Sequence, residues 1–124
     1  GSKHGTETFY HESGAKWYVA TYLYGRKQGP KIFYFEDGRK EMEVPYLNDT
    51  KNGVEMVWYP GGALKSETRF ENDRKVGLEA GYYENGRRAY EIPFENGKEH
   101  GTVRVWNERG ALTVTQWRNG AIEH

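Results

Sequence analysis

The sequence contains no cysteine, and only four of its 124 residues are proline. Without cysteine no disulfide can hold the fold together. Cysteine usage therefore does not indicate whether the protein works in an oxidising or a reducing compartment. Acidic and basic residues balance at 18 each, which argues against a nucleic-acid-binding protein because such proteins normally have a basic excess. The apolar runs are only a few residues long, far below the roughly 20 that a membrane-spanning helix needs.

Aliphatic residues are also scarce, since hydrophobic residues make up 35% of the chain and aromatic residues alone make up 15%. So few aliphatic side chains can hardly fill a two-layer core. The chain is nevertheless too aromatic and too regular to be disordered. A single-layer sheet that is braced by aromatic rings reconciles these facts.

The chain is an internal repeat. Five glycines are spaced 24 residues apart, at Gly5, Gly29, Gly53, Gly77 and Gly101. A second glycine follows each of these by nine residues, at Gly14, Gly38, Gly62, Gly86 and Gly110, and an aromatic residue precedes each of the second set by four, at Tyr10, Tyr34, Trp58, Tyr82 and Trp106. A fixed period with fixed internal positions indicates a repeat array, and such arrays usually serve as binding surfaces.

Each unit has two turn signals, such as Asn85-Gly86 and Asn96-Gly97 in the fourth unit. These dipeptides favour the left-handed backbone angles of tight hairpin turns, and the aromatic and β-branched runs between them are typical of strands. We therefore predict an all-β fold, a single-layer antiparallel meander of about ten strands built from five 24-residue β-hairpin repeats. Residues 3–124 form one domain, whose units start at the five glycines of the first set, whereas residues 1–2 look like the remainder of a cleaved tag. Because the chain does not start with Met, we expect the native protein to begin further upstream.

Alternation along the second strand of each hairpin predicts which face is buried. The face with Tyr22, Tyr46, Phe70 and Phe94 also carries Ala20, Val44, Thr68 and Ile92 and should be buried. The opposite face should be solvated. Its Pro45 and Pro93 cannot donate a ladder hydrogen bond and are expected where such a bond is already missing, for example at a bulge. The fifth unit is one residue short between Gly110 and Trp117 and is expected to cap the array.

Residues 77–101 carry Tyr82-Tyr83, Glu84-Asn85-Gly86, Glu91, Phe94 and Asn96-Gly97-Lys98. This pattern resembles the MORN repeat (membrane occupation and recognition nexus), and more closely its bacterial MORN-variant form. The resemblance implies a non-catalytic binding protein. Bacterial members are commonly antitoxins or immunity proteins encoded beside a toxin, and eukaryotic relatives with the original repeat are linked to membrane contact and scaffolding.

No catalytic constellation stands out. None of the four histidines has the spacing of a metal-ligand motif such as His-Glu-x-x-His. His4 and His100 share one turn position, which favours solvated turn residues. We expect no enzymatic activity, no metal and no cofactor.

Two rows of side chains are candidates for partner binding. Glu43, Glu67 and Glu91 recur at one phase of the solvated face, where either Lys40, Lys65, Arg69 and Arg88 neutralise them or they form an acidic strip for a basic partner. Phe35, Tyr59 and Tyr83 form an aromatic row that either binds a partner or braces the sheet. The predicted partner-binding residues are Phe35, Tyr59, Tyr83, Glu43, Glu67, Glu91 and Arg69.

The leading hypothesis is an antitoxin or immunity protein whose sheet occludes the active site of a cognate bacterial toxin. One rival is a carbohydrate or cell-wall binding module, because paired aromatic residues suit sugars. A second is a membrane-associated scaffold, with basic hairpin ends that contact anionic lipid. The open sheet edges allow a homodimer. The sequence does not decide between two compartments, the bacterial cytoplasm and, if a signal peptide preceded these residues, the periplasm.

Overall fold

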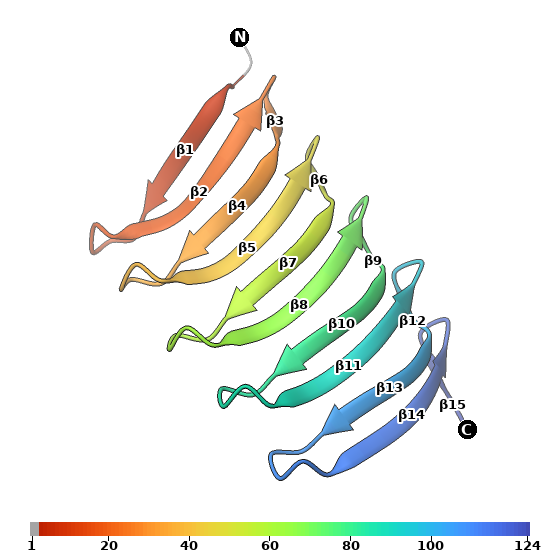
Figure 1. The fold of residues 1–124 in the computed structure, drawn as a ribbon. Coiled ribbons are helices and arrows are strands. Elements are labelled where there is room, and N and C mark those ends of the chain that lie inside the picture. Colours follow the sequence, from red (N-terminus) through yellow and green to blue (C-terminus); the bar gives the residue numbers. More distant parts are fainter. Residues whose placement is uncertain (1–2) are drawn as a thin grey trace.

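A computed structural model describes residues 3–124 as one open antiparallel sheet of 15 strands, with no helix in that range. The long strands follow one another in chain order from one end of the sheet to the other (Figure 1). The first hairpin lies at one end of a curved ribbon and the last at the other. The all-β, single-layer meander predicted from the sequence is confirmed.

Five hairpins supply the ten long strands. They are β1 (Gly5–Tyr10) with β2 (Lys16–Leu23), β4 (Gly29–Tyr34) with β5 (Lys40–Leu47), β7 (Gly53–Trp58) with β8 (Leu64–Glu71), β10 (Gly77–Tyr82) with β11 (Arg88–Glu95), and β13 (Gly101–Trp106) with β14 (Leu112–Arg118). Each first strand begins at one of the five repeat glycines, so the 24-residue period of the sequence is the period of the structure.

Five further strands are short, and the sequence pattern did not predict them. They are β3 (Arg26–Lys27), β6 (Thr50–Lys51), β9 (Arg74–Lys75), β12 (Lys98–Glu99) and β15 (Ala121–Glu123). Each folds back on the end of the preceding long strand across a two-residue turn. Asn48 and Asp49 form one such turn with φ angles of 49° and 69°, which is the type I′ geometry that asparagine and glycine tolerate.

Neighbouring units are joined mainly near their middle. Strand β5 pairs with β7 only through Met42–Val57 and Glu43–Met56. Pro45 lies beyond this pairing and opposite Pro30. Its missing N–H therefore falls where the hairpins diverge and no ladder hydrogen bond is lost, as predicted, although this place is not a bulge.

Bulges lie near the other end of the first four hairpins. In the second unit the register shifts between Phe33 and Tyr34, and Glu41 is the extra residue. The first, third and fourth hairpins shift at the equivalent point. The fifth hairpin pairs without a shift. The residue that its sequence lacks is therefore the bulge residue, and the last hairpin is the regular one.

Cross-strand partners define two faces. We call one the Phe70 face, which carries Ala20, Val44, Thr68, Phe70 and Tyr90, and the other the Trp58 face, which carries Ile32, Met56, Trp58, Glu67 and Glu91. The most buried side chains lie on the Phe70 face, where Ala20 is 1% exposed and Val44 is 3% exposed. This confirms the predicted buried face. Small residues fill it, and longer neighbours cover them.

Candidate functional site

One transverse row crosses the Trp58 face in continuous register. It runs through the strand pairs Val19–Ile32, Ile32–Glu43, Glu43–Met56, Met56–Glu67, Glu67–Ala80, Ala80–Glu91 and Glu91–Arg104. The three predicted glutamates do form a row, but one residue stands between each pair. Like charges therefore lie about 10 Å apart, at two strand spacings, and do not face each other directly.

Two of the three glutamates pair with basic residues, and Glu67 accepts a hydrogen bond. The Lys40 ammonium lies 3.4 Å from Glu43, and the Arg88 guanidinium pairs with Glu91. The Tyr82 hydroxyl donates to Glu67 at 3.0 Å. Partial burial, followed by this bond to Glu67, raises the pKa of Tyr82.

Two of the basic residues expected to neutralise the glutamates are placed elsewhere. The Lys65 ammonium lies 5.6 Å from the centre of the Tyr59 ring. Arg69 is exposed opposite Val54 and forms no ion pair within residues 3–124. The guanidinium group of Arg104 in the next unit forms a second ion pair with Glu91, at 3.8 Å. Sequence spacing missed this contact because it crosses from one hairpin to the next.

The middle of the Trp58 face is apolar and aromatic. Ile32, Tyr34, Met56 and Trp58 are all half-buried there. The Lys40 ammonium lies 5.9 Å from the centre of the Trp58 ring. Glu43 stands between Ile32 and Met56, and Glu67 stands on the other side of Met56, so charged and apolar side chains alternate across the strands. Aromatic residues and Met are enriched at protein-binding surfaces.

The predicted aromatic row lies at the hairpin ends and ties units together. The Tyr59 hydroxyl donates to the carbonyl oxygen of Tyr82 at 2.7 Å, and the Tyr83 hydroxyl donates to that of Trp106 at 2.6 Å. His11 occupies the same position in the first unit, with Nε2 3.0 Å from the Tyr34 carbonyl oxygen.

Phe35 belongs to this row but has no hydroxyl. Tyr59 and Tyr83 also line an open hollow of about 550 Å³ together with Glu84, Asn85 and Glu108. The hydroxyl groups of Tyr59 and Tyr83 therefore brace the sheet. Partner binding by the exposed parts of the rings stays a prediction.

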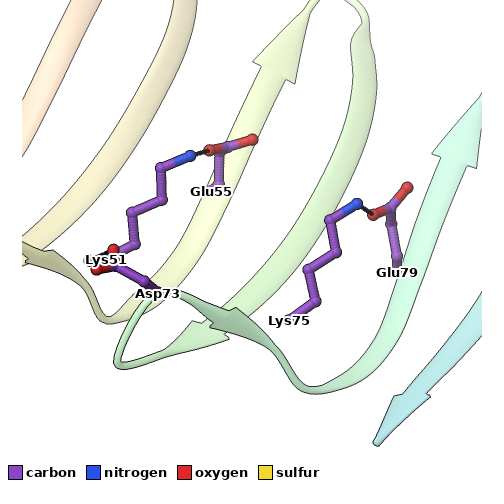
Figure 2. Close-up of polar contacts among 5 residues, drawn as sticks. All are labelled: Lys51, Glu55, Asp73, Lys75 and Glu79. Carbon is purple, nitrogen blue, oxygen red and sulfur yellow. Dashed lines mark hydrogen bonds and ion pairs between the residues drawn. The ribbon is translucent and has the colours of Figure 1, made fainter. Parts of the chain in front are cut away.

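The Phe70 face carries a second charged row that the sequence reasoning missed. A lysine recurs every 24 residues and lies over an aromatic ring, at 5.1 Å for Lys3 and Tyr22, 4.7 Å for Lys27 and Tyr46, 4.8 Å for Lys51 and Phe70, and 4.9 Å for Lys75 and Phe94. Figure 2 shows the ion pairs that Lys51 and Lys75 form with Glu55 and Glu79, four residues later. The lysine period was the available signal, but the lysines were considered only as basic hairpin ends that could contact anionic lipid.

The turns at the other hairpin end explain two of the histidines. The Nδ1 atoms of His4 and His100 accept hydrogen bonds from the backbone N–H groups of Tyr24 and Asn119, at 3.4 and 3.3 Å. Both act as turn residues, as expected. Within residues 3–124 there is no group of three or more His, Cys, Asp or Glu side chains that could hold a metal ion, nor a helix long and apolar enough to cross a membrane.

Known proteins provide one family match and a weak structural likeness. No curated protein matches the sequence. Among solved structures, the chain is similar to one chain of a crystal structure of the GtfA/B complex bound to UDP and GlcNAc, with 11% identity and a TM-score of 0.40 over 72% of this chain and 22% of that chain. The model of the MORN repeat variant family matches residues 3–24, 51–72 and 75–96. These segments are in phase with the 24-residue period and cover more than half of the sequence, so the chain belongs to the MORN repeat variant family.

Proposed function

We propose that the protein is a non-catalytic module that binds another protein through the Trp58 face. In the finer form of this proposal it is an antitoxin or immunity protein that covers the active site of a bacterial toxin. The observation that carries the proposal is the half-buried group of Ile32, Tyr34, Met56 and Trp58, which includes two aromatic rings and alternates across the strands with Glu43 and Glu67.

The contrast between constant and variable positions within the repeat unit supports this view. The repeat glycine and the two turns recur in unit after unit and are used by the framework. By contrast, one position in the first strand changes in every unit, as Thr8, Ile32, Met56, Ala80 and Arg104. These side chains lie on the Trp58 face. A constant framework with a variable surface is how repeat proteins obtain specific binding.

Growth of bacterial cells tests the proposal. The product of the gene beside the natural gene should stop growth when it is expressed alone, and co-expression of this protein should restore growth. Met56→Arg should abolish the rescue, because it removes an apolar side chain of this group and reverses the local charge between Glu43 and Glu67. Leu47→Arg is the matched control, since Leu47 is 53% exposed at the end of β5 and away from this group.

Circular dichroism should show that both variants keep the fold. A neighbouring gene product that does not affect growth would argue against the antitoxin role. Rescue that survives Met56→Arg would rule out the Trp58 face as the binding surface.

A further inference from the structure

The Phe70 face carries the same ion pair in three of the five units. The lysine and glutamate are four residues apart, and the distance from Nζ to the carboxylate oxygen is 2.9 Å in Lys3–Glu7, 3.0 Å in Lys51–Glu55 and 2.8 Å in Lys75–Glu79. Figure 2 shows how alike the last two are. In each pair the lysine also lies over an aromatic ring of the same face. The fold therefore builds a defined place for one carboxylate beside each of these lysines.

The second unit has a lysine at that place. Lys31 stands where the other units have Glu7, Glu55 and Glu79. Its ammonium lies 4.5 Å from the centre of the Tyr18 ring and 5.0 Å from that of Phe33. Lys27 lies 4.7 Å from the centre of the Tyr46 ring. The two ammonium groups thus lie over different rings of one face, and neither has a carboxylate within ion-pair distance in residues 3–124.

The arrangement is electrostatically unfavourable for the isolated protein. Partial burial, followed by the charge of Lys27, lowers the pKa of Lys31. Cross-strand packing holds Lys31 in place opposite Val44, which is only 3% exposed. A carboxylate that entered between the two lysines would remove the repulsion and keep the contacts with the rings.

The carboxylates closest in the repeat are already engaged. Glu7 and Glu55 occupy the equivalent places two strands away on either side, and they pair with Lys3 and Lys51. Asp49 accepts a hydrogen bond at 2.8 Å from the backbone N–H of Lys27. The missing negative charge must therefore come from another molecule.

We propose that Lys27 and Lys31 form a receptor for a single carboxylate, the Glu or Asp side chain of a protein partner. It takes the place that Glu7, Glu55 and Glu79 take in their own units. This proposal rests on the proposed protein-binding function and assigns part of the partner's surface to the Phe70 face.

The neighbouring charges favour a single acidic side chain over an anionic membrane. Glu7 and Glu55 lie about 10 Å to either side of Lys31, at two strand spacings. A flat layer of phosphate groups would meet both of these carboxylates as well as the lysines, whereas one carboxylate fits between them.

The first experiment is an NMR titration of the protein with a hexaglutamate peptide at low salt. The signals of Lys27, Lys31 and the Tyr18 and Tyr46 rings should shift more than those of other basic residues. Lys31→Glu should weaken binding at least tenfold. This variant should fold as well as the parent protein or better, because it restores the lysine–glutamate pair of the other units.

Arg26→Glu is the matched control, since it reverses one exposed charge next to Lys27 but outside the pair. It should change the affinity less than twofold. Equal losses in the two variants, or shifts spread evenly over the basic turns, would overturn the proposal. So would vesicles of phosphatidylserine that bind more tightly than the peptide in a manner that depends on Lys31, because the site would then recognise a lipid headgroup.

The second experiment separates this proposal from the proposed function. If the parent protein captures the neighbouring gene product and Lys31→Glu does not, while Arg26→Glu does, the receptor is supported. If all three capture it equally, the protein-binding function stands and the lysine receptor is wrong. If the parent protein captures nothing, the proposed function is contradicted, and the peptide titration alone decides whether the lysine pair binds a carboxylate.

Discussion

The Tyr90 ring lies directly over Gly81, its partner across the β10–β11 pair. A Cβ atom built on Gly81 would lie 2.0 Å from Cε1 of that ring. The ring thus fills the space that a side chain at position 81 would occupy, and Gly81 is buried as a result. The Tyr90 hydroxyl donates a hydrogen bond to the Glu79 carboxylate at 2.9 Å.

Gly81→Ala should destabilise the protein by roughly 1–3 kcal/mol, because the added methyl group overpacks the contact with a ring that a hydrogen bond holds. Urea unfolding followed by circular dichroism measures this loss. Gly61→Ala is the matched control, because a Cβ atom there has nothing within 4 Å. Its stability should stay the same or rise by up to about 1 kcal/mol. Equal effects in the two variants would show that the ring moves aside.

Tyr83→Phe should lower the free energy of unfolding by about 1 kcal/mol, because the Trp106 carbonyl loses its hydroxyl donor. The reverse change is available in the second unit. Phe35→Tyr should supply the corresponding donor to the Trp58 carbonyl and raise stability by a similar amount. Chemical denaturation of both variants checks the pair. If Phe35→Tyr brings no gain, the hydroxyl contacts are incidental to the joining of the units.

Tyr24→Asn should stabilise the first inter-unit turn by roughly 1 kcal/mol. Tyr24 has φ of 52°, in the left-handed region where most side chains are strained and asparagine is tolerated. It is also 73% exposed, so little packing is lost. The converse change, Asn96→Tyr at φ of 52°, should cost a similar amount. Thermal melts of both variants would contradict this expectation if the two shifts had the same sign.

Alkaline pH should destabilise the protein through Tyr90. Burial, followed by the bond to Glu79 and the charge of its carboxylate, raises the pKa of Tyr90 above the ordinary value of 10.0. The folded state therefore favours the neutral phenol, and its contribution is fully present below pH 10. As the pH rises above about 10, the unfolded chain ionises first and stability falls.

Urea unfolding at several pH values between 8 and 11.5 measures this slope. Tyr90→Phe should show a shallower fall because it removes one of the responsible groups, although Tyr82, whose pKa is also raised, remains. Parallel slopes in the variant and the parent would mean that Tyr90 ionises in the folded state as easily as in the unfolded chain.

The hairpins could be predicted from the sequence because their signals are local. The repeat glycines and the Asn-Gly turns fix where each strand begins and ends, and alternation correctly placed Val44 and Phe70 on the buried face. The short strands were missed because two residues between turn signals carry no detectable periodicity. Pro45 was correctly predicted at a place without a ladder hydrogen bond. The sequence did not show that pairing between hairpins ends before this residue, because that is a property of the sheet and not of a single strand.

The candidate site was less accessible to sequence reasoning, because its contacts cross between units. Tyr59 and Tyr83 stood out as aromatic residues, but the carbonyl groups that their hydroxyls reach lie 23 residues further on. Arg88 was among the residues expected to neutralise the glutamates. The contact of Glu91 with Arg104 of the next hairpin was not expected. Lys31 was overlooked because one lysine among 18 basic residues becomes unusual only when its ring contacts and its repeat equivalents are compared.

Each long strand pairs only with the strands beside it in the chain. The length of the sheet is therefore set by the number of units. Excising residues 53–76 would join Asn52 to Gly77, a glycine that starts its unit just as Gly53 does. The product should be about 10 Å shorter, the width of two strands, with every surviving hairpin unchanged. The reach of this surface across a partner can therefore grow or shrink in whole units, without any redesign of the parts that stay.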